Sequence, residues 1–143
     1  MKLTSDSFGH REAIPAEFAL GAPDGFGGNR NPHLAWRDAP AGTRSVALLC
    51  IDTDAPTDAA LAGKEGVEIP VDHLRGDFVH WAVVDIPADV HDIAAGSASH
   101  GVHKGGKPAG DGAGMREGLN DYTRWFAGDN SGMRGEYHGY DGP

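Results

Sequence analysis

The fold of this chain is decided by two apolar segments, which run from Arg44 to Asp52 (RSVALLCID) and from Asp77 to Ile86 (DFVHWAVVDI). Both are rich in residues that favour strands, and both are apolar on the two faces of the expected strand. Such segments are typical of central strands that are covered on each side. Glycine and proline supply 22 and 9 of the 143 residues and bracket the apolar segments. The sequence therefore predicts an all-β domain with minor helix.

The remaining segments have weaker patterns. Further strands are expected over Leu3–Phe8 and Leu34–Trp36. The segment from Thr57 to Gly76 is expected to be a crossing loop with one short helical turn over residues 58–63. Residues 96–135 contain many glycines and few apolar residues, so a long loop insertion is expected there, with its low-complexity part at residues 105–114.

Length, charge and cysteine content restrict the class of protein. A chain of 143 residues fits one domain, over residues 1–143, with its own core. The only cysteine, Cys50, lies in an apolar run, which excludes an internal disulfide and favours a buried thiol. A formal net charge of -9 argues against nucleic-acid binding. The absence of a signal-like or membrane-spanning apolar run leads us to expect a cytoplasmic protein without integral membrane association.

Two carboxylates stand at the end of the first strand. If the strand continues through them, Asp52 and Asp54 point to the same face, and Pro56 ends the strand just beyond. The alternative is a turn in which the aspartate side chains accept hydrogen bonds from nearby backbone amides. The spacing alone leaves both interpretations open.

His80 lies inside the second strand, where an imidazole without a partner would be costly to bury. A carboxylate from Asp52 or Asp54 would fix its tautomer and raise its pKa, so that the other ring nitrogen could donate to an anion. Two alternatives remain open: a core histidine without a ligand, and a calcium or zinc site made by the same three residues.

Other motifs favour structural roles. Gly101–Pro108 has nearly the spacing of a phosphate-binding loop, but Pro108 stands where a hydroxyl is needed, so a surface loop is expected. His100 and His103 are expected to be solvated loop residues. Ser97 and Ser99 lack the sequence context of a hydrolase nucleophile. The three tryptophans are expected in the core or in a cavity wall, at Trp36, Trp81 and Trp125.

Four motifs occur in an order and approximate spacing that match a known family. They are NPHLAW (31–36), PAGTRS (40–45), DTDAP (52–56) and HWAVVDIP (80–87). Read together, they strongly resemble the phosphatidylethanolamine-binding protein family, in particular its bacterial and archaeal branch, often called Raf-kinase-inhibitor-like. The resemblance runs from the N-terminus to the last residue.

The resemblance implies a Greek-key β-sandwich with a small anion pocket at one end. In the family pattern, His80 is the imidazole that faces the phosphate, next to a block that corresponds to residues 52–56. A second block resembles the segment YDGP at residues 140–143. The ligand-binding residues implied by the resemblance are Asp52, Asp54, Ala55, Pro56, His80, Tyr140, Gly142 and Pro143.

Family members continue beyond this second block through another proline, a His-Arg-Tyr strand and a C-terminal helix. The sequence therefore predicts a domain that is truncated at its C-terminus and leaves sheet neighbours unpaired. A fragment or processed form is favoured, and a natural short form that has lost half of its ligand site is the alternative. The insertion over residues 96–135 departs from the compact members, and the sequence leaves open whether it covers the pocket.

The function expected from these residues is non-catalytic binding of a phosphate-bearing small group, such as a phospholipid headgroup or a phosphorylated ligand. Modulation of a kinase or protease partner and homodimerisation are expected by analogy only. No cofactor or metal is expected. Two alternatives remain: an acid-base hydrolase that uses Asp52, Asp54 and His80, and a scaffold with a vestigial pocket.

Overall fold

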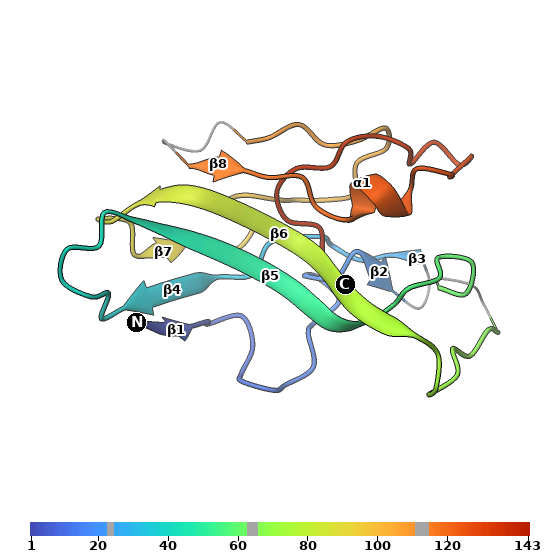
Figure 1. Ribbon diagram of the computed structural model, residues 1–143, viewed down its shortest axis with the longest axis horizontal. Helices are drawn as coiled ribbons and strands as arrows, with labels where there is room; N and C mark the ends of the chain where they lie inside the picture. The colour runs from blue at the N-terminus through green and yellow to red at the C-terminus, as the bar shows by residue number, and fades with distance from the viewer. Residues whose placement is uncertain (23–24, 63–65, 111–114) are drawn as a thin grey trace.

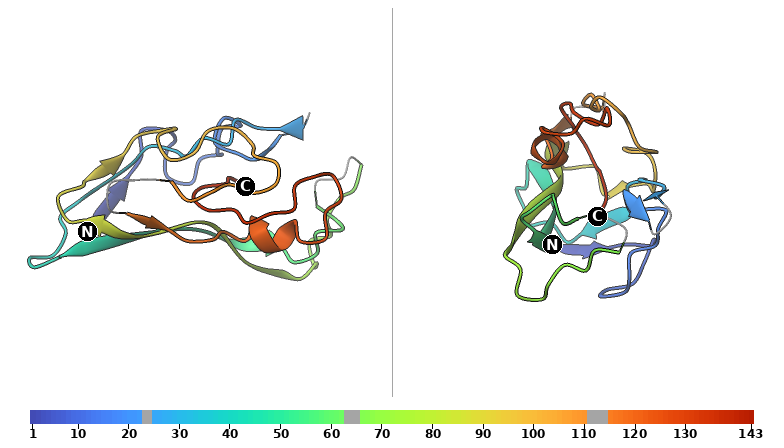
Figure 2. Two further views of the ribbon diagram at one scale, coloured as in Figure 1. Left: turned by 90° about the horizontal axis from the view of Figure 1, so that it is seen from above. Right: turned by 90° about the vertical axis from the view of Figure 1, so that its right-hand side faces the viewer.

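The computed structural model describes residues 1–22, 25–62, 66–110 and 115–143. Its strands form antiparallel sheets in two layers (Figures 1 and 2). One sheet has the order β1-β4-β7, another the order β5-β6-β8, and β2 pairs with β3. The elements are β1 (Lys2–Thr4), β2 (Gly21–Ala22), β3 (Gly25–Phe26), β4 (Leu34–Arg37), β5 (Ser45–Pro56), β6 (Arg75–Pro87), β7 (Asp92–Ile93), β8 (Arg116–Glu117) and α1 (Tyr122–Trp125).

The two long strands, β5 and β6, form the backbone of the fold. They pair from Ser45 opposite Pro87 to Pro56 opposite Arg75, and the register shifts at three places. One shift lies between Asp52 and Ala55, where the regular alternation of side chains is lost. This irregularity places successive side chains of the DTDAP segment in different surroundings.

The main core lies between the two three-stranded sheets. Trp36 of β4 and Ile93 of β7 come from one sheet, and they meet side chains of β5 and β6 from the other. The buried members of this core are Trp36, Leu48, Trp81, Val83, Ile86, Ile93 and Tyr140. Trp36 and Trp81 are therefore core residues, in agreement with the sequence analysis.

A second core cluster lies beside α1, in the part of the chain that was expected to be a long loop. Tyr122 and Met133 from this part are buried against Leu20 and Tyr137. Residues 96–135 also supply β8, which pairs with β6, and α1 itself. The segment is therefore a loop with two short regular elements, and its few apolar side chains gather into a core of their own. Residues 111–114 of the expected low-complexity part lie outside the described residues.

The all-β class is confirmed: the described residues contain a single short helix. Other details differ from the expectation. The first strand ends at Thr4 instead of Phe8, and residues 58–61 form a hydrogen-bonded turn, with Gly63 outside the described residues. β5 is not covered on both faces: Leu49 and Ile51 are 60% and 43% exposed. Exposed and more buried residues alternate along the strand from Ser45 to Asp52, so one face of β5 packs on the core and the other faces solvent.

The C-terminal residues run between the two layers, close to β2 and β3 (Figure 2). The carbonyl oxygen of Pro143 accepts hydrogen bonds from the backbone amides of Leu20 and Gly21. Gly142 is held at Asn29, whose side-chain oxygen accepts its amide proton. No helix among the described residues is long and apolar enough to cross a membrane.

Candidate functional site

A cavity of about 550 Å³ opens where the ends of β5 and β6 meet α1 and the C-terminus. Most of its wall is apolar or aromatic, whereas its ionisable side chains at neutral pH are Asp52 and His80. The lining residues are Leu20, Gly21, Gly25, Phe26, Asp52, Ala55, Pro56, Ala62, Phe78, His80, Tyr122, Trp125, Phe126 and Pro143. A mostly apolar cavity with a few polar groups is the usual form of a small-molecule site.

His80 is the buried polar group of this cavity, with 4% of its surface exposed. Its Nδ1 lies 2.7 Å from the carbonyl oxygen of Asp141. A carbonyl oxygen only accepts hydrogen bonds, so Nδ1 must carry the proton and donate. Among the described residues, none forms a hydrogen bond to Nε2. The neutral ring therefore presents Nε2 as an acceptor, and only the protonated ring can donate from it.

The environment of His80 lowers its pKa. Burial is the largest cause, because an imidazolium is poorly solvated there; the bond to Asp141 and the carboxylates of Asp52, Asp141 and Asp121 act in the opposite direction. The sequence analysis expected an Asp52 or Asp54 carboxylate as the partner and a raised pKa. Both expectations were wrong, since the partner is a backbone carbonyl and desolvation exceeds the attraction of the nearby carboxylates.

Aromatic rings pack around the imidazole. The ring of Phe78 lies 4.9 Å from that of His80 and 4.9 Å from that of Tyr122, measured between centroids. Trp125 meets Phe78 edge to face at 5.6 Å. The Tyr122 hydroxyl donates to the carbonyl oxygen of Gly142 at 2.7 Å, which ties α1 to the C-terminal segment. The expected insertion over residues 96–135 thus supplies one wall of the cavity.

Asp52 and Asp54 do not act together. Asp52 lines the cavity, whereas Asp54 is exposed and does not line it. The Asp52 carboxylate accepts the backbone amide proton of Asp54 at 2.8 Å. The strand therefore continues through both aspartates to Pro56, and the side-chain hydrogen bond expected for a turn is also present. The register shift after Asp52 explains why the carboxylates do not share a face.

Of the other residues implied by the family pattern, some line the cavity and some do not. Ala55, Pro56 and Pro143 line the cavity. Tyr140 does not: its ring packs on Trp81 in the main core, and its hydroxyl donates to the carbonyl oxygen of Phe18 at 2.6 Å. Gly142 lies behind the wall and contributes backbone hydrogen bonds.

Asp141, which the sequence analysis did not single out, is 1% exposed and forms a buried ion pair with Lys107 at 2.9 Å. Lys107 was expected on a surface loop, and that expectation was wrong. No local pattern marks it, because its neighbours are glycines and a proline; only contact with Asp141, distant in sequence, explains its burial.

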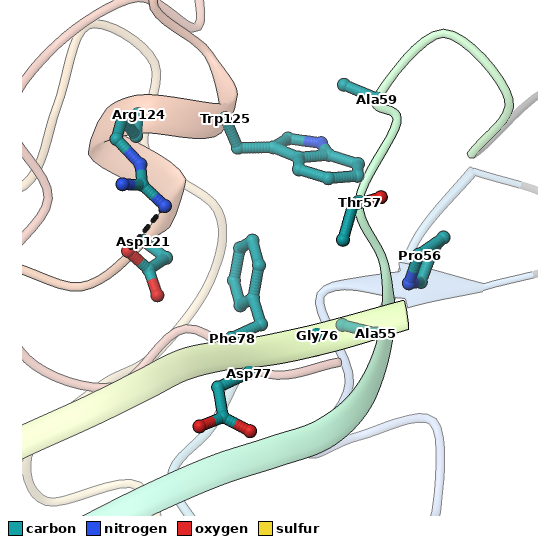
Figure 3. A pocket seen from close by; sticks show the side chains of 10 residues that line it. All are labelled: Ala55, Pro56, Thr57, Ala59, Gly76, Asp77, Phe78, Asp121, Arg124 and Trp125. Atoms are coloured by element: carbon teal, nitrogen blue, oxygen red, sulfur yellow. Dashed lines mark ion pairs between the residues drawn. The ribbon is translucent and has the colours of Figure 1, made fainter. Parts of the chain in front are cut away.

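A second, smaller cavity of about 240 Å³ lies beside the first (Figure 3). The two share residues of the β5 end together with Phe78 and Trp125. Figure 3 shows the Trp125 ring extending from α1 toward Thr57, with Phe78 below it. Arg124 and Asp121 form an ion pair at its edge, at 3.9 Å.

The remaining candidates from the sequence line a separate, open cavity of about 510 Å³, which contains Ser97, Ser99, His100 and His103. His100 and His103 are exposed. The Ser99 hydroxyl is buried and donates to the carbonyl oxygen of Asn29. Among the described residues, no group of three or more histidine, cysteine, aspartate or glutamate side chains is placed to hold a metal ion.

The family model for the phosphatidylethanolamine-binding proteins matches residues 4–143. The chain belongs to this family. The match confirms the resemblance found in the four sequence motifs, and the two-layered β-structure agrees with it.

Several members of the family are similar to this chain. The protein YbhB of Escherichia coli is 33% identical over 99 residues, which make up 69% of this chain and 52% of that protein. An Aquifex aeolicus relative is 29% identical over 140 residues, or 98% of this chain and 62% of the relative. The crystal structure of E. coli YbcL, described as a new member of the mammalian family, matches with a TM-score of 0.64 at 25% identity and covers 99% of this chain and 65% of that one. The chain thus spans between half and two thirds of the length of these relatives.

Proposed function

We propose that this protein binds a small phosphate-bearing group, such as a phospholipid headgroup or a phosphorylated metabolite, in the cavity around His80, and that it does so without catalysis. The observation that carries the proposal is the buried imidazole of His80, whose Nδ1 is held by Asp141 while Nε2 has no partner among the described residues. Family membership supports it, since the family takes its name from a phospholipid.

The charges of the cavity determine how a phosphate would bind. Asp52 repels an anion, and the burial of His80 favours the neutral imidazole. One proton must therefore be present between ligand and protein. It resides either on Nε2, which then donates to the phosphate, or on a phosphate oxygen, which donates to Nε2. Both arrangements contain the same number of protons, so binding is coupled to the uptake of one proton when the phosphate is doubly charged.

This coupling has a measurable consequence. The second pKa of a phosphate monoester is about 6, and the pKa of His80 is lowered from its ordinary value. Above both values, phosphate affinity is expected to fall about tenfold for each unit of pH, because one proton must be taken up from solution. A site with a permanent cation would lack this steep dependence.

The walls of the cavity favour a ligand that has an uncharged part beside the phosphate. The phosphate itself needs only a fraction of the 550 Å³, and Phe78, Tyr122 and Trp125 provide apolar and aromatic surface next to His80. A ligand of this shape could link the site to a protein partner, and modulation of a kinase or protease is part of the proposal.

The test is a titration of the protein with phosphoethanolamine, with the histidine ring resonances followed by NMR at pH 6 and pH 8. A saturable change at the His80 ring, stronger at the lower pH, is expected. Affinity in the variants is measured by calorimetry: binding is expected to be lost in His80→Gln and kept in His100→Gln, on an exposed loop, which is the matched control. Recovery of the phosphoethanolamine unchanged is expected for a non-catalytic site. Equal affinity of His80→Gln and the unmodified protein would refute the proposal, and turnover of the ligand would favour the acid-base enzyme instead.

A further inference from the structure

The buried ion pair of Lys107 and Asp141 lies outside the lining of the cavity but next to its imidazole. The two side chains are 8% and 1% exposed. Charges so deeply buried are stable only when all of their hydrogen-bonding groups are satisfied. The ion pair of Lys107 and Asp141 therefore needs a hydrogen-bond partner for each polar group, and these partners connect it to His80.

Each charge has a full set of partners. Lys107 Nζ donates to the Asp141 carboxylate, to the Ser99 hydroxyl and to the carbonyl oxygen of Tyr140. The Asp141 carboxylate also accepts from the side-chain amides of Asn29 and Asn120, each at 2.7 Å. Lys107 thereby holds the peptide group between residues 140 and 141 as well as the side chain of residue 141.

The N–H of this peptide group contacts His80, and the next peptide group, between residues 141 and 142, carries the carbonyl oxygen that meets Nδ1. The backbone amide of Asp141 donates to the carbonyl oxygen of His80 at 3.1 Å, and the carbonyl oxygen of Asp141 accepts from Nδ1 at 2.7 Å. We propose that Lys107 and Asp141 are positioning residues for His80: they hold this carbonyl oxygen against Nδ1 and so fix the tautomer that leaves Nε2 free for the cavity. The importance of this for ligand binding rests on the proposed function above.

The physical reason is that the hydrogen bond at one ring nitrogen determines which nitrogen carries the proton. If the carbonyl oxygen of Asp141 moves away, the neutral ring is free to carry its proton on Nε2 instead. The groups that face His80 are the carboxylates of Asp52, Asp121 and Asp141 and the rings of Phe78 and Tyr122. The carbonyl oxygen of Asp141 is the hydrogen-bond partner that the described residues give to Nδ1.

The experiment compares Lys107→Met with Tyr137→Phe. The first removes the cation from the pair; the second removes a buried hydroxyl that bonds to Met133 and His103, away from His80. Nitrogen chemical shifts of the His80 ring report its tautomer in the ligand-free protein above its pKa. Inorganic phosphate is then titrated into each variant at pH 6.

Lys107→Met is expected to shift the ring toward the Nε2-protonated tautomer and to weaken phosphate binding about tenfold, a loss equal to one hydrogen bond. Tyr137→Phe is expected to leave the tautomer unchanged even where it lowers the melting temperature. If a folded Lys107→Met keeps the original tautomer, the inference is overturned.

A second variant covers the case in which the single substitution prevents folding. Lys107→Gln combined with Asp141→Asn removes both charges while keeping polar side chains, so it leaves no lone buried charge. It is expected to show the same change of tautomer, and an unchanged ring would overturn the inference. Because the tautomer is read without ligand, a failure of this inference is distinct from a failure of the proposed function, in which the unmodified protein would not bind phosphate.

Discussion

The tyrosines of this protein are expected to resist ionisation until the chain unfolds. All three, Tyr122, Tyr137 and Tyr140, are buried. Each hydroxyl donates to a backbone carbonyl oxygen, and burial raises each pKa above the ordinary value. Raising the pH above 10, where an exposed tyrosine ionises, therefore tests whether these hydroxyls are buried.

The sign follows from proton binding in the two states. A tyrosine with a raised pKa keeps its proton in the folded state while the unfolded chain loses it, so stability is complete below pH 10 and decreases above it. For Tyr122 and Tyr140, whose pKa values are shifted most, the decrease is about 1 kcal/mol each at pH 11 and about 3 kcal/mol each at pH 12. The two together remove roughly 5 to 6 kcal/mol at pH 12, comparable to the whole stability of many domains of this size.

The assay records tyrosinate absorbance and far-UV circular dichroism during an alkaline titration. The two are expected to change together, in one cooperative step well above pH 10, whereas the same protein in denaturant is expected to titrate near pH 10. A reversible rise of tyrosinate absorbance near pH 10 with unchanged circular dichroism would refute the reasoning, because it would mean that the hydroxyls reach solvent.

Three further predictions concern single substitutions. Gly142→Ala would place a Cβ atom against the backbone oxygen of Phe18, so a loss of about 1–3 kcal/mol is expected in a denaturant titration, and weaker phosphate binding in a ligand titration. Gly128→Ala, in open space, is expected to change neither. Ile86→Ala in the core is expected to lower the free energy of unfolding by about 2–5 kcal/mol. Val84→Ala, at a 41% exposed site, is expected to lower it by less than about 1 kcal/mol. Similar losses at both sites would contradict the position of the core. Asp52→Asn removes the negative charge of this carboxylate from the cavity. It is expected to tighten phosphate binding and to lower the pKa of His80 further. Weaker phosphate binding would show that the Asp52 carboxylate contacts the ligand favourably.

The sequence was sufficient for the fold class and for the family. The apolar segments that became β5 and β6 were recognised because strand propensity and regular punctuation by glycine and proline are local properties. The motifs of the family are local as well. Asp52, Pro56 and His80 line one cavity because they lie in or beside these segments, and their role in binding a ligand stays a prediction.

Several details of the site depended on contacts that no local pattern contains. His80 finds its partner in Asp141, 61 residues away along the chain, and its pKa falls because burial exceeds the attraction of nearby carboxylates. Asp54 does not line the cavity because of a single register shift. Such a shift turns a side chain to the other face of the sheet, and no clear sequence pattern predicts it.

By itself, the sequence determined which segments are strands, which family they belong to and which side chains could carry chemistry. Only the tertiary structure decided that Lys107 is buried, that Tyr140 faces the core, and that the His80 imidazole donates to a backbone carbonyl oxygen. The physical reason is that strand formation follows from neighbours along the chain, whereas burial and hydrogen-bond partners follow from neighbours in space.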